Sequence, residues 1–470
     1  MVRRERIRWA AACGAITTAF ILSSCGGSSS GSHAIASVPP TSTTDLTSKT
    51  PPNGPAGTQL RWFLSSVADT HVSQQEIESH FDAFFLGKIS AAKMSAALAE
   101  LPAPGTLVGV LSSEPTGLVV IANFGTEHVQ GAEPSPGLRL KVTLSVNGSG
   151  LIDGLKFAPV LATSWSQIDQ TLAALAPSVS FLAARVTNGS CQTIHQLASS
   201  TPRPLASEFK LFVLGALAHQ IAAGHVTWDQ ELTVEGQLKS SGNPVGSGSL
   251  QFVPAGTRVS VRETATKMIS ISDNTAADML INLVGQPALE SQIQQWSNDP
   301  HLDVPFLTTR QMILLHYVNF PMLASAYLAR PPSKRQAFLN SVVDPLSLSE
   351  VQGSTEPRDI DKIEWFGSPD DICRAFVGLQ QLSRQPKLSP IASIFSVNKG
   401  GLGLDPSEWP TVWFKGGSEP GVLTLGYMAT NSRGQTFVVS AMLSSATAAL
   451  APSATLALLE AVVGAFGLMR

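Results

Sequence analysis

The stretch Ser207-Glu208-Phe209-Lys210 begins the most apolar helical segment of this 470-residue chain, which runs to about Ala223 and stops at Gly224. Positions i and i+3 share one face of a helix, so Lys210 can reach the Ser207 hydroxyl. Burial lowers the pKa of a Lys amine, and a neutral Lys210 can accept the hydroxyl proton. Backbone N–H groups of the first turn can stabilise an oxyanion. We therefore predict Ser207 as a nucleophile and Lys210 as its base.

Two other Ser-x-x-Lys tetrapeptides occur, at residues 90–93 and 396–399. The first lies on an amphipathic helix and the second precedes a Gly-rich loop, so neither is expected to carry chemistry.

A second polar motif, Ser272-Asp273-Asn274, interrupts two helical segments. All three residue types are good helix N-caps, but capping explains only one of them. In the functional interpretation, Ser272 relays a proton to the leaving group and Asn274 hydrogen-bonds the substrate or Lys210. Asp273 is predicted to help bind substrate.

A third motif, Lys415-Gly416-Gly417-Ser418, lies on a strand-like run. Lys415 would offer a positive charge to a substrate carboxylate, and two glycines would let a ligand lie against the strand. The Ser418 N–H is the predicted second oxyanion donor. Gly416, Gly417 and Ser418 are thus predicted as substrate-binding residues, although such a tripeptide alone is more often a turn.

Residues 165–470 are predicted to form one α+β domain. Two strand runs flank Asn188-Gly189, a hairpin signal. Mostly helical sequence fills residues 260–395, and three further strand runs precede a last helix. This order predicts an antiparallel sheet packed with helices, with an all-helical subdomain beside it. The expected strands are residues 179–186, 192–197, 411–417, 422–430 and 436–443, and the last helix is 452–466.

Residues 59–160 are predicted to form a smaller α+β domain. Ser73, followed by Glu76, is typical of a helix start, and Ile77, Phe81 and Phe85 follow at helical spacing. A second helix and four strand runs come next. Two helices followed by an antiparallel sheet resemble the cystatin-like or NTF2-like arrangement. No cluster of catalytic residue types is present, so this domain is interpreted as a spacer or binding module.

Residues 1–25 are predicted to be a lipoprotein signal peptide. Four Arg precede an apolar run from Trp9 to Leu22, which is too short to span a bilayer. The run ends in Leu22-Ser23-Ser24-Cys25-Gly26, which resembles a bacterial lipobox with Cys25 as the lipidated residue. Residues 26–58, rich in Gly, Ser, Thr and Pro, are predicted to be a disordered tether. The protein is thus expected on the extracytoplasmic side of a cell membrane.

Composition excludes some classes of function. The formal net charge is −3, and it becomes −6 once the four Arg and one Glu of residues 1–25 are removed, so no nucleic-acid partner is expected. No Cys or His spacing indicates a metal, and no cofactor is predicted. Cys191 and Cys373 either pair in an oxidising compartment or remain as two buried thiols.

The three motifs together resemble those of class A serine β-lactamases and penicillin-binding proteins. The segments Phe306–Arg310 and Trp413–Gly421 are similar to actinobacterial relatives. The domain order resembles that of two-domain β-lactamase-like proteins of clavulanic acid gene clusters. The signal peptide and the domain order together resemble those of a mycobacterial-type lipoprotein. The resemblance covers residues 165–470 well and 59–160 loosely. It implies an acyl-enzyme mechanism on an ester, amide or β-lactam.

Two departures from the family pattern affect this interpretation. Gly416 stands where the family has Thr or Ser, and residues 301–310 lack the Glu that activates the deacylating water. Asp303 is a weak substitute. A weak β-lactamase, an esterase or a carboxypeptidase-like enzyme is therefore expected rather than an efficient β-lactamase. The residues 319–370 resemble an insertion, and Trp365, Phe366 and Trp413 are expected in an acyl pocket or in the core.

Two function hypotheses follow. The favoured one is a lipid-anchored serine hydrolase acting on a small acyl substrate. The alternative is a catalytically inactive cell-envelope binding lipoprotein that keeps the β-lactamase-like fold.

Overall fold

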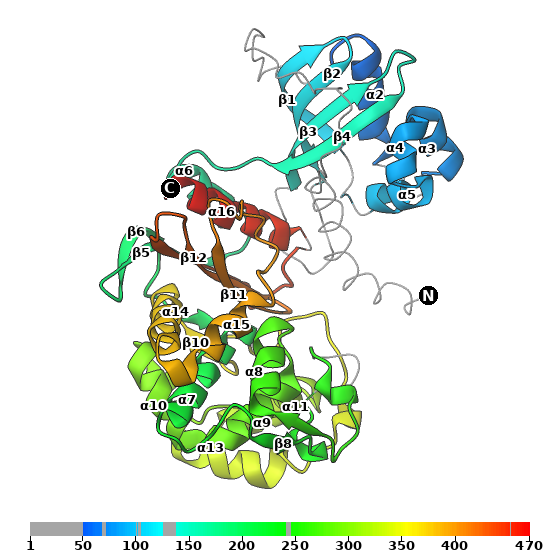
Figure 1. Ribbon diagram of the computed structural model, residues 1–470. Coiled ribbons are helices and arrows are strands. Elements are labelled where there is room, and N and C mark those ends of the chain that lie inside the picture. Colours follow the sequence, from blue (N-terminus) through cyan, green and yellow to red (C-terminus); the bar gives the residue numbers. More distant parts are fainter. Residues whose placement is uncertain are drawn as a thin grey trace. The chain divides into compact units, whose positions relative to one another are not determined.

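The computed structural model describes residues 50–67, 72–99, 101, 105–125, 138–240, 246–451 and 453–470 (Figure 1). The chain divides into two compact units. Among the described residues, the first comprises those within 50–125, 138–161 and 453–460, and the second comprises those within 162–451 and 461–470. Cys25, the predicted signal peptide and most of the predicted tether lie outside the described residues. Within the described part, no helix is long and apolar enough to cross a membrane.

The first unit contains four short helices followed by a four-stranded antiparallel sheet with the order β1-β2-β3-β4. Ser73 caps α3 by accepting a hydrogen bond from Glu76 N, as the sequence predicts. The elements are α2 Pro55–Ser66, α3 Gln74–His80, α4 Ala83–Lys88, α5 Ala91–Ala99, β1 Gly105–Glu114, β2 Gly117–Phe124, β3 Leu138–Val146 and β4 Ile152–Pro159.

Two boundaries in this unit differ from the prediction. The expected helix through Phe85 is broken at Phe81, which adopts an extended backbone and forms a β-bridge with Ile152. Asp82 then caps α4 by accepting from Phe85 N. α2 also begins at Pro55, inside the stretch predicted as a tether. The cystatin-like or NTF2-like assignment stays a prediction.

The second unit is built on a five-stranded antiparallel sheet with the order β11-β12-β13-β5-β6. Asn188 and Gly189 both have positive φ and form the turn of the β5–β6 hairpin. The predicted closure of the sheet is confirmed, because β13 from near the end of the chain pairs with β5. The strands are β5 Ser178–Thr187, β6 Ser190–Leu197, β11 Thr411–Glu419, β12 Val422–Thr430 and β13 Thr436–Ser444.

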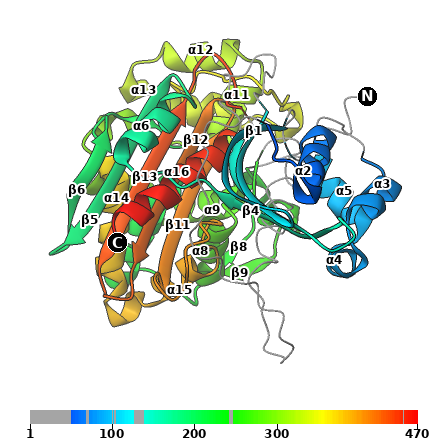
Figure 2. The same cartoon turned by 90° about the horizontal axis from the view of Figure 1, so that it is seen from above.

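Helices cover the sheet and form a separate group beside it, as predicted (Figures 1 and 2). α14 contacts β13 and β5, whereas α8, α9 and α11 pack with one another away from the sheet. The helices are α6 Trp165–Ala173, α7 Lys210–Ala222, α8 Val261–Ser270, α9 Asn274–Val284, α10 Gln286–Trp296, α11 Thr309–Tyr317, α12 Met322–Leu328, α13 Pro332–Phe338, α14 Pro369–Ser383, α15 Pro390–Ser396 and α16 Ala454–Leu468; short strands are β7 Arg203–Pro204, β8 Glu231–Thr233, β9 Arg258–Ser260 and β10 Phe366–Gly367.

The α7 helix lies at the centre of this unit. Ten of its thirteen residues are buried, including Lys210 at its start. A helix that is apolar on all faces must be surrounded, and α7 packs against α10, α14 and α9. This burial fixes the position of the residues that precede the helix.

Cys191 on β6 and Cys373 on α14 form a disulfide. The sequence left this pairing open. The bond joins the outer strand of the sheet to a helix 182 residues later in the chain.

Candidate active site

The predicted nucleophile lies in a tight turn just before α7. Residues Ala206–Phe209 form a 3-10 turn rather than the first turn of the predicted α-helix. Ala206 has a φ of 44°, a conformation that is rare for residues other than Gly. Its N–H donates to Glu364 Oε2, and Leu205 N donates to Trp365 O. These bonds hold Ser207 half-exposed at the start of a buried helix.

The Lys210 amine contacts all the residues predicted to act with it except Lys415. Its Nζ lies 2.9 Å from Ser207 Oγ, 2.6 Å from Asn274 Oδ1, 2.7 Å from Ser272 O and 3.1 Å from Ser272 Oγ. Lys210 is fully buried. Burial, together with the nearby Lys415, lowers the pKa of Lys210 well below its ordinary value.

The partners of Lys210 fit a neutral amine. A neutral amine has two N–H donors and one lone pair. Ser272 O and Asn274 Oδ1 only accept, so they take the two donors. The lone pair is then left for the Ser207 hydroxyl. In its neutral form, Lys210 is therefore placed 2.9 Å from Ser207 Oγ, where it can accept the hydroxyl proton.

The Ser272–Asn274 turn joins α8 to α9 and divides its three residues between two tasks. Ser272 has a φ of 57°, and its Oγ lies 3.1 Å from Lys210 Nζ and 3.1 Å from Lys415 Nζ. It therefore bridges the two amines. Asn274 holds Lys210 from the other side.

The prediction that Asp273 binds substrate is contradicted. Asp273 is fully buried and caps α9 by accepting from Ala276 N. Its other oxygen accepts from Ser249 N and Leu250 N, at 2.6 and 2.8 Å. The same oxygen also accepts from Ser249 Oγ. Both oxygens are thus engaged by neighbouring protein groups, so Asp273 positions the turn.

The third motif lies on β11, the edge strand next to the nucleophile. Lys415 is 2% exposed, and its Nζ lies 2.5 Å from Gly416 O as well as near Ser272. A Cβ at Gly417 would come within 2.5 Å of Ser207 N and of Leu205 O. The absence of a side chain there lets β11 approach the nucleophile turn. Ser418 is exposed beside Ser207 in the same cavity.

The structure explains the departure at Gly416. A Cβ at this position would lie 2.9 Å from both Thr424 O and the Phe414 ring. A Thr or Ser therefore does not fit without a shift of the neighbouring strand or ring. Phe414 in turn packs on Tyr427, with ring centroids 4.7 Å apart.

Glu208, the second residue of the Ser-x-x-Lys motif, was not predicted as a site residue. It is fully buried, and a Cβ on Gly426 would lie 2.4 Å from its Oε1. Gly426 pairs with Lys415 across the two strands. Burial raises the pKa of Glu208 to about 8, and burial lowers the pKa of Lys415 to about 7. The sequence carried no signal for a buried Glu208 beyond its place inside the Ser-x-x-Lys motif.

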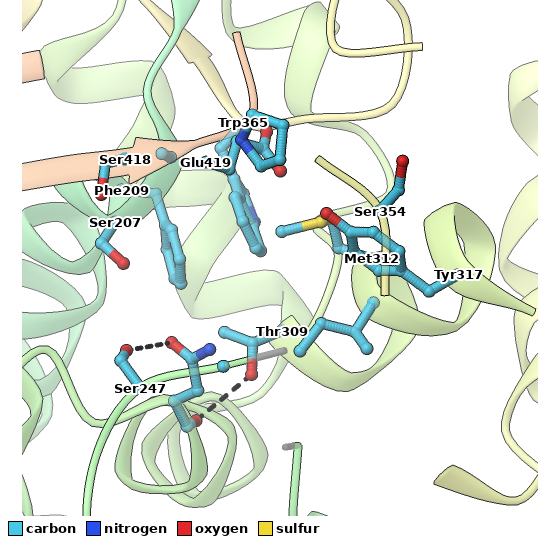
Figure 3. Close-up of a pocket in the computed structure, with 15 residues that line it drawn as sticks. Ser207, Phe209, Ser247, Thr309, Met312, Tyr317, Ser354, Trp365, Ser418 and Glu419 are labelled. Carbon is cyan, nitrogen blue, oxygen red and sulfur yellow. Dashed lines mark hydrogen bonds between the residues drawn. The ribbon is translucent and has the colours of Figure 1, made fainter. Parts of the chain in front are cut away.

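A cavity of about 350 Å³ opens over Ser207. In Figure 3, Ser207 and Ser418 lie on one side of it and Tyr317, Met312 and Ser354 on the other. Its walls combine polar and apolar side chains. The fifteen lining residues are Ala206, Ser207, Phe209, Gly246, Ser247, Asn274, Thr309, Met312, Ile313, Tyr317, Ser354, Trp365, Ser418, Glu419 and Pro420.

The residues that line the cavity test three predicted positions, those of Trp365, Trp413 and Asp303. Trp365 lines it and stacks on Phe209, with ring centroids 3.8 Å apart. Trp413 instead stacks on Phe395 in the core. Asp303, the suggested substitute base, does not line the cavity. Its Oδ1 instead accepts a hydrogen bond from Phe366 N. Burial raises the pKa of Asp303 to about 8.

Ser247 was missed because it lies in a loop without a motif. Its Oγ donates to Ser272 O at 2.6 Å, and its O accepts from Asn274 N. It therefore braces the Ser272–Asn274 turn. Among the described residues, no group of His, Cys, Asp and Glu is arranged to hold a metal ion.

Part of the second unit matches a known protein family. Residues 164–312 match the beta-lactamase enzyme family. This match begins before β5 and includes Ser207, Lys210 and the Ser272–Asn274 turn. The second unit thus contains a β-lactamase-like region, with helices and an antiparallel sheet. Residues 51–152 match a separate family described as the N-terminal part of the ORF 12 gene product.

Several solved structures are similar to about two thirds of the chain. A structure of PBP-A is 18% identical, with a TM-score of 0.44, over 65% of this chain and 94% of that chain. A β-lactamase from Sphaerobacter thermophilus is 18% identical, with a TM-score of 0.43, over 64% and 96%. A β-lactamase from Chitinophaga pinensis is 17% identical, with a TM-score of 0.44, over 65% and 97%. No curated protein matches the chain.

Proposed function

We propose that the protein is a serine hydrolase that cleaves an ester, amide or β-lactam through an acyl-enzyme on Ser207. One observation carries the proposal. The Lys210 Nζ lies 2.9 Å from Ser207 Oγ while two pure acceptors occupy its donors. A hydroxyl bound to the lone pair of a buried amine is an activated nucleophile.

Acylation follows from these contacts. Ser207 Oγ attacks the substrate carbonyl carbon as its proton passes to Lys210 Nζ. The oxyanion faces the N–H groups of Ser207 and Ser418. When the bond to the leaving group breaks, the proton moves from Lys210 through Ser272 Oγ to the leaving atom, along contacts of 3.1 Å. The acyl group then remains on Ser207 as an ester.

Deacylation reverses these roles. A water molecule attacks the ester carbonyl carbon and gives one proton to Lys210. The bond to Ser207 Oγ then breaks, and the same proton returns to that oxygen. Because Lys210 serves both half-reactions and Asp303 lies elsewhere, slow deacylation is expected. This favours weak turnover of β-lactams and faster turnover of activated esters.

Steady-state hydrolysis of short-chain p-nitrophenyl esters and of a chromogenic cephalosporin tests the proposed function. The full chain is expected to hydrolyse the esters with saturation kinetics and the cephalosporin more slowly. Hydrolysis of neither substrate above the spontaneous rate would contradict the proposal. It would leave the alternative, an inactive binding lipoprotein, which the missing hydroxyl at position 416 favours.

We also propose that the protein is exported and held at the cell membrane by lipid on Cys25. The lipobox-like residues 22–26 support this. A Cys25→Ala chain is expected to leave the membrane fraction and to lose incorporation of an alkyne-labelled fatty acid. Labelling that persists in the variant would refute the anchor.

A further inference from the structure

Two acidic side chains meet at the end of β11, where the strand enters the cavity. Glu419 is the last residue of β11 and lines the cavity, although its side chain is only 10% exposed. Glu364 lies behind it and is 3% exposed. Glu364 Oε2 accepts from Ala206 N at 3.2 Å and from Trp365 N at 2.6 Å. The pair therefore links the nucleophile turn to the end of β11.

The two carboxyl groups influence each other's ionisation. Oε1 of each is buried without a hydrogen-bond partner in the structure. Burial, with Glu419 nearby, raises the pKa of Glu364 well above its ordinary value. Burial alone would raise the pKa of Glu419 too, but hydrogen bonds from His316 and Glu364 lower it. Glu364 thus keeps the proton and Glu419 carries the charge.

Glu419 is the one charged residue among the described residues that line the cavity. His316 Nδ1 lies 3.7 Å from Glu419 Oε2 on the side away from the cavity, since His316 is itself buried and does not line it. Phe209, Trp365 and Tyr317 make much of the remaining wall apolar. A carboxylate in such surroundings interacts strongly with a ligand charge because little water screens it.

The acyl part of a substrate is the part that reaches Glu419. Ser272, which would pass the proton to the leaving group, and Lys415 do not line the cavity, whereas Phe209, Trp365 and Glu419 do. An acyl chain that occupies the cavity along Phe209 and Trp365 would reach Glu419. In Figure 3, Glu419 is labelled next to Ser418, close to Phe209 and Trp365.

We propose that Glu419 is a specificity residue that selects substrates whose acyl group carries an ammonium ion. The inference rests on the proposed function, because it concerns the substrate of the same site. An ammonium group towards the far end of the acyl chain would replace water as the partner of Glu419. A carboxylate at that place would be repelled.

Three matched p-nitrophenyl esters test the inference on the full chain. They are the 6-aminohexanoate, the heptanoate, in which a methyl group replaces the ammonium, and the monoester of adipic acid. The expected order of kcat/KM is ammonium, neutral, carboxylate, with about tenfold between the first two. Equal rates for the ammonium and neutral esters would overturn the inference and leave the proposed function intact. Absence of any Ser207-dependent hydrolysis would overturn both.

Two isosteric variants separate the roles of the acidic pair. Glu419→Gln is expected to reduce the ammonium-to-neutral ratio to about one. Glu364→Gln imitates the protonated form of Glu364. The amide oxygen can still accept from Ala206 and Trp365, and the amide N–H can donate to Glu419. The ammonium-to-neutral ratio of this variant is therefore expected to equal that of the wild type. The control Glu235→Gln removes a charge from an exposed loop residue and keeps the ratio. A preference that survives in Glu419→Gln would refute the assignment.

Discussion

Replacing Ser207 with Ala is expected to lower kcat for p-nitrophenyl ester hydrolysis by at least about a thousandfold. The variant removes only the Oγ atom, which forms the bond to the acyl group and rests on Lys210 Nζ. The cavity and the helix behind it do not depend on this atom. Stopped-flow or steady-state kinetics at 405 nm measure the effect, and circular dichroism checks that the variant is folded.

The chain supplies its own control for this substitution. Ser396 also begins a Ser-x-x-Lys sequence, but its Oγ donates to Ser393 O within a helix. Ser396→Ala is expected to keep wild-type kinetics. A Ser207→Ala variant as active as Ser396→Ala would show that another residue is the nucleophile.

Replacing Lys210 with Arg is expected to lower the acylation rate by about 10³-fold. A guanidinium stays protonated at every accessible pH, so it has no lone pair for the Ser207 proton. It adds a buried positive charge in place of a neutral amine, and its N–H groups can still donate to Asn274 and Ser272. The single-turnover burst of p-nitrophenol measures acylation directly. A variant that keeps the burst rate would exclude Lys210 as the base.

The pH dependence has a predicted sign. Burial and Lys415 lower the pKa of Lys210, so this amine is neutral above its lowered pKa and gains a proton as the pH falls through it. The kcat/KM for the neutral heptanoate ester is therefore expected to fall as the pH drops through this lowered pKa, and the fall is expected well below the pH at which an ordinary Lys gains its proton. The Lys210→Arg variant is expected to lose this acid limb. A wild-type activity that appears only near pH 10 would contradict a lowered pKa.

Much of the fold could be predicted from the sequence, because apolar periodicity and turn residues mark its elements. The Asn188-Gly189 hairpin and the predicted strands 422–430 and 436–443 agree closely with the turn between β5 and β6 and with β12 and β13. The break at Phe81 could not be predicted. Its position depends on a bridge to Ile152, a residue 71 positions away, and on capping by Asp82, whereas the local spacing favours one continuous helix.

The three sequence motifs predicted the residues around the nucleophile but not the acidic residues that contact the turn and the cavity. Ser207, Lys210, Ser272, Asn274 and Lys415 come together because short spacings fixed their local geometry and the fold joined them. Asp273 was predicted to bind substrate but caps α9. The sequence could not separate these roles, because Asp serves both helix capping and ligand binding. Glu364 and Glu419 belong to no motif, and only the pairing of distant segments reveals them.

Intact-mass spectrometry of the full chain after brief exposure to benzylpenicillin or an activated ester, quenched in acid, tests the account most directly. We predict a mass increase equal to the whole β-lactam or to the acyl group of the ester. Peptide mapping is expected to place it on Ser207, and Ser207→Ala is expected to show no increase. A covalent mass on another residue, or no adduct with either reagent, would contradict the account.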